Sequence, residues 1–282
     1  MDWLTEYKLP IGPWAKSFVD WLTDNAYWFF DAISVGLEFM IDGILWLLQA
    51  PHPLVIVVVA SGIAYAVHRK IGFAVFVAAS LLLIINQGYW EETTETLALV
   101  VAASIVCMVI GVPVGVAAAH RPRLFAAIRP VLDLMQTIPT FVYLIPALIL
   151  FGLGMVPGLI ATVIFAIPAP IRLTQLGVSS TPKQLLEAGL AFGATKSQLL
   201  WKIELPYALP QIMAGLTQTI MLSLSMVVIA ALVGADGLGV PTLRALNTVN
   251  IAKGFEVGVA IVLIAIVLDR FFRTKAVEGG KS

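Results

Sequence analysis

The chain has 282 residues, of which 60% are hydrophobic and only 12% are charged. Soluble domains carry about 25% charged residues, so this composition indicates an integral membrane protein. The formal net charge of +0 offers no basic field for nucleic acid, and a single cysteine, Cys107, excludes an intrachain disulfide and a thiolate metal site. Cys107 lies in an apolar run, and we interpret it as a packing residue.

The first residues, 1–30, are expected to form an interfacial amphipathic segment. Trp14, Phe18 and Trp21 recur at helical spacing, whereas Lys16 falls on another face. Aromatic side chains gather at the boundary between membrane and water. A disordered polar tail is the alternative. The start also lacks a basic stretch followed by a short apolar core, so we expect no cleaved signal peptide.

Eight apolar runs predict an all-α membrane protein. A helix needs about 20 apolar residues to cross about 30 Å of hydrocarbon. The runs cover roughly residues 31–49, 54–67, 71–86, 95–119, 130–152, 156–173, 208–233 and 254–272. The first three form an accessory group within 31–90. Glu38 and Asp42 lie on one face of the first run, and we interpret that helix as amphipathic or protein-facing rather than as a proton relay, because no matching carboxylates recur later.

Lysine and arginine set the expected orientation, since they are enriched in cytoplasmic loops. Alternating spans bring most of the basic residues to one side: Arg69, Lys70, Arg121, Arg123, Arg129, Arg172, Lys183, Lys196, Lys202, Arg270, Arg273, Lys275 and Lys281. The opposite loops hold only Arg244 and Lys253, besides the acidic Glu91 and Glu92. We therefore expect the first side, and both termini, to be cytoplasmic.

A polar segment between the spans ending at 173 and beginning at 208 predicts a first short helix. Thr181 is the expected N-cap and Pro182 the first helical residue, and Gln184 completes a capping box. Gly193 falls where a helix favours a left-handed C-terminal residue.

A second short helix is expected directly after this turn. Thr195 and Gln198 repeat the capping pattern. The helix then passes through Trp201, and Pro206 and Pro210 are expected to limit it, because neither donates a backbone hydrogen bond. An ordinary capped hairpin between two spans is the alternative interpretation of these local signals.

The order of residues in this segment resembles the cytoplasmic coupling loop of ABC-importer permeases, which docks in a cleft of a separate ATPase. Its spacing matches throughout, with Gly189 in place of the usual second alanine. The resemblance implies a coupling loop over 180–207, with a site formed by Glu187, Ala188, Gly189, Gly193, Ile203, Leu205 and Pro206. Glu187 would be the polar anchor, and the small residues after it would let a partner surface approach closely.

Further passages resemble permeases of the glycine betaine/proline/choline import family. They span residues 132–139, 141–146, 158–166, 170–174, 193–195 and 218–228. The likeness covers about two thirds of the chain and favours a choline-type system. It implies a type I ABC-importer transmembrane core over 91–274 with extra N-terminal helices, followed by a cytoplasmic tail at 275–282.

Two groups of residues are candidates for a translocation path. Pro139 and Pro146 lie inside an expected span, and backbone freed by proline at membrane depth is tolerated where it lines a cavity. Met135, Gln136 and Pro139 are the first group, although a kinked packing helix is equally compatible. Gln218, Leu222 and Ser225 share one face of the 208–233 span, where polar residues also serve to join helices.

The glycine-rich stretch 234–239 follows a membrane helix, so it does not fit a phosphate loop. We expect either a gate-region loop near the external mouth or a flexible turn. The chain has no Walker A sequence. The resemblance therefore implies that this chain holds no cofactor, and that a partner ATPase binds ATP and Mg.

These features predict the permease subunit of an ATP-driven, binding-protein-dependent importer of a quaternary ammonium osmolyte in a bacterial inner membrane. Its expected partners are the ATPase, an external substrate-binding protein and a second permease copy. No catalytic or metal-binding set is expected, which argues against a membrane-embedded enzyme. The alternatives are an ion-coupled secondary transporter of a small cationic or zwitterionic solute and an osmosensing channel. The transporter would need midplane ionisable residues or paired broken helices.

Overall fold

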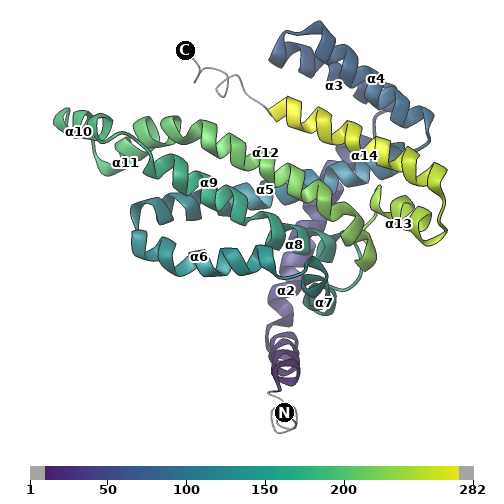
Figure 1. Ribbon diagram of the computed structural model, residues 1–282, viewed down its shortest axis with the longest axis horizontal. Coiled ribbons are helices and arrows are strands. Elements are labelled where there is room, and N and C mark those ends of the chain that lie inside the picture. The colour runs from purple at the N-terminus through teal and green to yellow at the C-terminus, as the bar shows by residue number, and fades with distance from the viewer. Residues whose placement is uncertain (1–9, 273–282) are drawn as a thin grey trace, which may run out of the picture.

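Helices make up the described part of the chain, residues 10–272 of this computed structural model, and no strand occurs within that range. The elements are α2 (Ile11–Gln49), α3 (Pro53–His68), α4 (Ile71–Asn86), α5 (Trp90–His120), α6 (Pro122–Thr137), α7 (Thr140–Phe151), α8 (Met155–Ala166), α9 (Pro168–Ser179), α10 (Lys183–Ala191), α11 (Lys196–Leu199), the π-helical η1 (Leu200–Glu204), α12 (Leu205–Ala230), the 3₁₀-helical η2 (Ala231–Val233), α13 (Gly239–Asn247) and α14 (Ile251–Phe272). The all-α prediction is confirmed (Figure 1). The expected tail at 275–282 and the first nine residues lie outside the described range.

The centre of the molecule is a bundle in which α9 packs against both α5 and α12, with α8 beside them. Glycines allow these helices to approach closely. A Cβ atom added at Gly111 would lie 2.8 Å from Pro170 Cγ, and one added at Gly115 would lie 2.7 Å from the Ile171 carbonyl oxygen. In a membrane, helices associate through such close packing because lipid is as apolar as the helices themselves.

The number of long straight spans is smaller than expected. Four helical stretches are long and apolar enough to cross a membrane: Trp90–His120, Met155–Ser179, Lys196–Val233 and Ile251–Phe272. Two further pairs, α2 with α3 and α6 with α7, are each bent by 97°. The described residues thus offer four to six crossings by length and composition, and the prediction of eight spans is not confirmed.

The expected span over 130–152 is wrong as a single helix because it breaks at Ile138 and Pro139. Ile138 is extended, with φ −67° and ψ 132°. A residue before proline is pushed out of the α region, and proline itself lacks the N–H that would continue the helix. Pro139 is consequently the N-cap of α7, whereas Pro146 lies inside that helix.

The first accessory helix is kinked. α2 consists of two helical parts that meet at Ala26, where φ is −124° and ψ is 16°, and the expected boundary at residue 30 lies four residues beyond this kink; the division into 1–30 and 31–90 stays a prediction. Trp14, Phe18 and Trp21 are exposed on α2, and their place at a membrane surface stays a prediction. α3 and α4 have 16 residues each, or about 24 Å at 1.5 Å per residue, which is short for a crossing.

Candidate functional site

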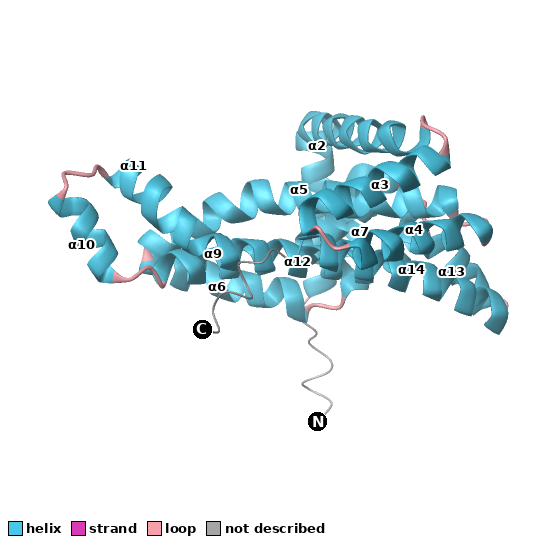
Figure 2. Ribbon diagram, turned by 90° about the horizontal axis from the view of Figure 1, so that it is seen from above, coloured by secondary structure: helices cyan, strands magenta, loops and turns pink. Residues whose placement is uncertain are grey.

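The expected coupling loop projects from one end of the molecule. α10 and α11 lie beyond the ends of α9 and α12, away from the rest of the helices (Figures 1 and 2). α10 contains no buried residue. A pair of short helices that stands clear of the rest of its own protein leaves its surface free for a partner, as the expected coupling loop requires.

Capping defines the second helix of the loop as expected, but not the first. Gln198 N donates to Thr195 Oγ1 at 3.3 Å, and Thr195 N donates to Gln198 Oε1 at 2.8 Å, which confirms the capping box. Thr181 is not an N-cap; Pro182 holds that position. Thr181 instead follows the C-cap of α9: its N–H donates to the Val178 carbonyl at 3.2 Å, and its buried hydroxyl has no hydrogen-bond partner within residues 10–272.

The turn between the two short helices depends on Gly193, as expected. Its φ of 76° lies in the left-handed region, which residues with a Cβ adopt at a cost. Gly193 N donates to the Leu190 carbonyl at 2.9 Å, and Ala194 N donates to the Gly189 carbonyl at 3.0 Å. These bonds close the C-terminus of α10 and reverse the chain direction.

Gly189 faces the second helix of the loop, a packing role that the sequence did not indicate, while its contact with a partner stays a prediction. A Cβ atom added there would lie 2.6 Å from Leu199 Cδ2 and 2.8 Å from Ile203 Cδ1. The glycine therefore lets the second helix of the loop approach the first. Glu187 and Ala188 are exposed on α10, and Gly193 and Pro206 are the other exposed members of the motif.

Phe192 is a surface residue of the loop that sequence reasoning missed. It is 92% exposed at the tip, beside the half-exposed Leu190. Phe192 and Leu190 together give the tip an apolar surface, the kind of surface that a partner protein covers. Its signal in the sequence was an aromatic residue next to Gly193 within a polar segment.

Pro206 and Pro210 do not limit the second helix. Helix runs without interruption over Lys196–Val233, and the five residues of η1 adopt π geometry, in which Leu205 N donates to the Leu200 carbonyl. Pro206 then lies in the first turn of α12, where proline is tolerated. A single helix therefore leads from the expected coupling loop, residues 180–207, which we also call the docking loop, into the membrane bundle. There the half-buried Leu205 packs against a small apolar cluster of α5, α9 and α12.

The break between α6 and α7 is stabilised by a side chain. Tyr143 Oη donates to the Met135 carbonyl at 2.7 Å and to the Leu134 carbonyl at 3.2 Å. Both carbonyls belong to the last turn of α6: that of Leu134 also accepts from Ile138 N at 3.0 Å, whereas the residue four positions after Met135 is Pro139, which has no N–H to donate. Met135 and Gln136 are half-buried and Pro139 is exposed. The first group of path candidates therefore lies around the bend between α6 and α7, which the Tyr143 hydroxyl stabilises.

The second group of path candidates does not share one environment. Gln218 and Ser225 are exposed on α12, whereas Leu222 is half-buried against the main core. Ser225 Oγ donates to the Met221 carbonyl of its own helix at 3.0 Å, and not to a neighbouring helix. Met135 packs against the same main core as Leu222, while a path function of either group stays a prediction.

The glycine-rich stretch after α12 is packed and not a free turn. Leu238 is fully buried, and its N–H donates to Thr96 Oγ1 at 2.8 Å. Gly237 has φ 118°, and a Cβ there would lie 2.6 Å from the same oxygen. Residues 234–238, which we call the outer loop after its expected position, are therefore attached to the first turns of α5.

Residues 111–274 match the family model described as "Binding-protein-dependent transport system inner membrane component". The chain belongs to this ABC-importer permease family. The glycine betaine permease OpuAB of Bacillus subtilis is 43% identical over 93% of this chain and 93% of its own length. The glycine betaine/proline betaine permease ProW of Escherichia coli is 43% identical over 93% of this chain and 74% of its own length.

A solved structure supports the same fold. The inward-facing MetNI methionine ABC transporter, in its native crystal form, matches with a TM-score of 0.58 and 26% identity, covering 68% of this chain and 96% of that chain. The permease therefore has the expected type I importer core and is a multi-pass membrane protein. Between residues 10 and 272, no group of three or more His, Cys, Asp or Glu side chains could hold a metal ion.

Proposed function

We propose that this permease is the membrane subunit of an ATP-driven importer that moves a quaternary ammonium osmolyte into the cell. The observation that carries the proposal is the projecting loop, whose continuous helix connects an exposed docking surface to the bundle core. Such a connection is what a transporter needs if an event outside the membrane is to bias two states of the membrane helices.

The docking partner in this proposal is an ATPase, two copies of which bind ATP and Mg between them. Glu187, Ala188 and Phe192 form the exposed surface that would enter its cleft. Closure of the ATPase dimer would move α10 and α11, and the helix Lys196–Val233 would carry this movement into the bundle. A homodimer of permeases supplies one loop to each ATPase copy.

The proposed orientation places the loop in the cytoplasm. His120 at the end of α5 contacts Glu204 at the base of the loop, so Arg121 and Arg123 lie at the same end of the molecule as Lys196 and Lys202. This gathering of positive charge supports a cytoplasmic face in an inner membrane. An external binding protein would deliver substrate at the opposite end, near the outer loop.

Glycine betaine is the first substrate to test, with choline retained beside it. Permeases that match 93% of the chain are named for glycine betaine with proline betaine or carnitine. The choline permease OpuBD of Bacillus subtilis is 37% identical over 55% of the chain. Selectivity would reside in the binding protein, where aromatic side chains can surround a quaternary ammonium group.

The deciding experiment is substrate-stimulated ATP hydrolysis. The permease is reconstituted in vesicles with its ATPase and with a binding protein loaded with glycine betaine, proline betaine, carnitine or choline. Stimulation by one loaded binding protein, accompanied by uptake, is expected and names the substrate. Assembly without any stimulation would contradict the quaternary amine proposal.

An ion-coupled transporter remains the second candidate because two bent helix pairs occur, a feature of that class. However, Asp133 forms an ion pair with Arg172 at 2.6 Å and is not an isolated proton carrier. Uptake that collapses with an uncoupler while ATP is held constant would favour this candidate.

A further inference from the structure

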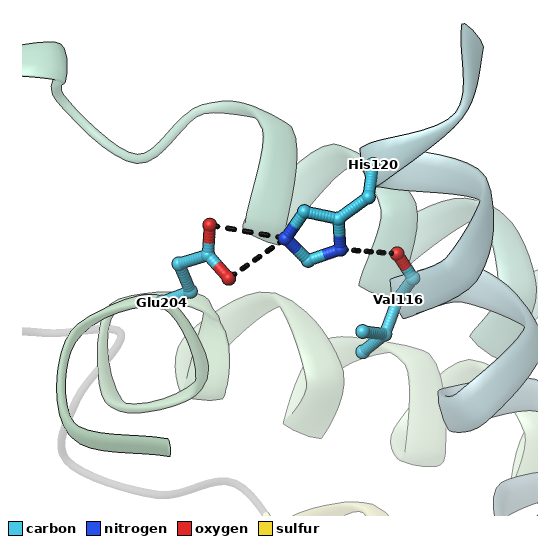
Figure 3. Close-up of polar contacts among 3 residues, drawn as sticks. All are labelled: Val116, His120 and Glu204. Carbon is cyan, nitrogen blue, oxygen red and sulfur yellow. Dashed lines mark hydrogen bonds and ion pairs between the residues drawn. The ribbon is translucent and has the colours of Figure 1, made fainter. Parts of the chain in front are cut away.

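His120 and Glu204 form a contact between two elements that are far apart in the sequence. His120 is the last residue of α5, and Glu204 is the last residue of η1, 84 positions later. Figure 3 shows the imidazole pointing at the carboxylate, with Nε2 at 2.9 Å and 3.1 Å from its two oxygens. On the other side of the ring, Nδ1 lies 3.0 Å from the Val116 carbonyl oxygen.

The chemistry of these partners makes the contact directional. A carbonyl oxygen only accepts, so Nδ1 carries a proton and is held by the helix itself. The ring is thereby fixed with Nε2 facing the carboxylate, and one proton lies between Nε2 and Glu204. The hydrogen bond is therefore either between imidazolium and carboxylate or between neutral imidazole and carboxylic acid.

Glu204 depends on this partner. Its side chain is only 10% exposed, and within residues 10–272 its hydrogen bonds are those to His120. A carboxylate removed from water is costly unless it is paired. The apolar cluster nearby includes Val116, Ala119 and Leu205. It holds the helices together but does not fix their relative position along the contact, since apolar surfaces can slide past one another.

The pair lies where the docking loop joins the bundle. Glu204 is at the point where the helix from the docking loop enters the bundle. Its contact with His120 is the side-chain hydrogen bond that connects α5 to the segment Lys196–Glu204 in the described part of the chain. The opposite end of α5 holds the outer loop through Thr96 and Leu238. α5 therefore has a polar attachment at each end, to the base of the docking loop at one end and to the outer loop at the other.

We propose that His120 and Glu204 are positioning residues that fasten α5 to the base of the docking loop, so that movement of the loop reaches α5 and, through it, the outer loop. This inference rests on the proposed function, because it assigns a route for the coupling. Without the pair, the loop would still dock and move α12, but α5 would follow poorly.

The first test measures substrate imported per ATP hydrolysed in the reconstituted complex. His120→Ala and Glu204→Ala are each expected to lower this ratio at least about five-fold. Glu204→Gln is the conservative variant, because its amide N–H can donate to Nε2 of a neutral imidazole, and it should restore most of the ratio. His68→Ala is the matched control: His68 Nε2 lies 3.3 Å from the Phe271 carbonyl oxygen, also joining two helices, and should leave the ratio unchanged.

The second test follows the contact itself and does not require transport. Spin labels are placed at Arg121→Cys and Ser197→Cys, both exposed, after the buried Cys107 is replaced by serine. The distance distribution between the labels should be narrow in the unmodified background and clearly broader in both alanine variants, with and without ATP.

An unchanged distance distribution together with an unchanged import ratio in the alanine variants would overturn the inference. Failure of the proposed function is recognised separately, because the parent complex would then show no ATP-dependent uptake. The distances would still report whether the pair fastens the two helices. Loss of import in Glu204→Gln equal to that in Glu204→Ala would also contradict the role of the hydrogen bond.

Discussion

At the residue scale, Gly193 controls the direction of the chain in the docking loop. Its left-handed backbone costs about 1–2 kcal/mol for a residue with a Cβ. Because α10 has no buried residue, this strain would be relieved by moving the loop rather than by unfolding the bundle. We expect Gly193→Val to abolish uptake while the unfolding midpoint of the purified protein stays unchanged. Gly193→Asn, which tolerates this conformation, should keep substantial uptake; equal loss in both variants would contradict the argument.

A second prediction at this scale concerns charge. Glu187 is exposed on α10, so Glu187→Lys should leave insertion and folding intact while it removes the proposed polar anchor. We expect uptake to be lost and co-purification with the ATPase to be weakened. Asp20→Lys makes the same charge change on exposed α2 and should have no effect. Normal uptake by Glu187→Lys would defeat the assignment of the loop.

At the scale of elements, close approach between helices determines the stability of the bundle. A Cβ at Gly115 meets the backbone oxygen of Ile171 at 2.7 Å, so Gly115→Ala requires α5 and α9 to separate. Overpacking of this kind costs about 1–3 kcal/mol, and we expect a lower midpoint in thermal unfolding. Gly43→Ala on α2 meets nothing within 4 Å and gains helix propensity. A midpoint for Gly115→Ala no lower than for Gly43→Ala would show that the crossing is looser than described.

At the scale of the whole molecule, orientation is the property to measure. With Cys107 replaced by serine, Ser197→Cys on the docking loop and Asp236→Cys on the outer loop are exposed at opposite ends. A membrane-impermeant thiol reagent applied to intact cells should label Asp236→Cys only, and Ser197→Cys should react after the cells are opened. The reverse pattern would invert the proposed topology. The parent protein, with its single buried Cys107, should remain unlabelled in both conditions.

The membrane location, the turn and cap of the docking loop, and the family could all be predicted from the sequence alone. Composition alone placed it in the membrane, because 12% charged residues cannot cover a soluble surface. Thr195, Gln198 and Gly193 specified their cap and turn, since the hydrogen bonds concerned join residues three to five positions apart. The order of residues from Glu187 to Pro206 indicated the family, which the comparisons confirmed.

Other features were decided only by tertiary structure. Gly189 lies against the second helix of the loop, which packs on it. The helix that continues through Pro206 is packed at Leu205 against residues of α5 and α9, which are far away in the sequence. The pairing of His120 with Glu204 joins residues 84 positions apart. No local spacing contains that information, because such a contact exists only once the packing of α5, α9 and α12 has brought the two helix ends together.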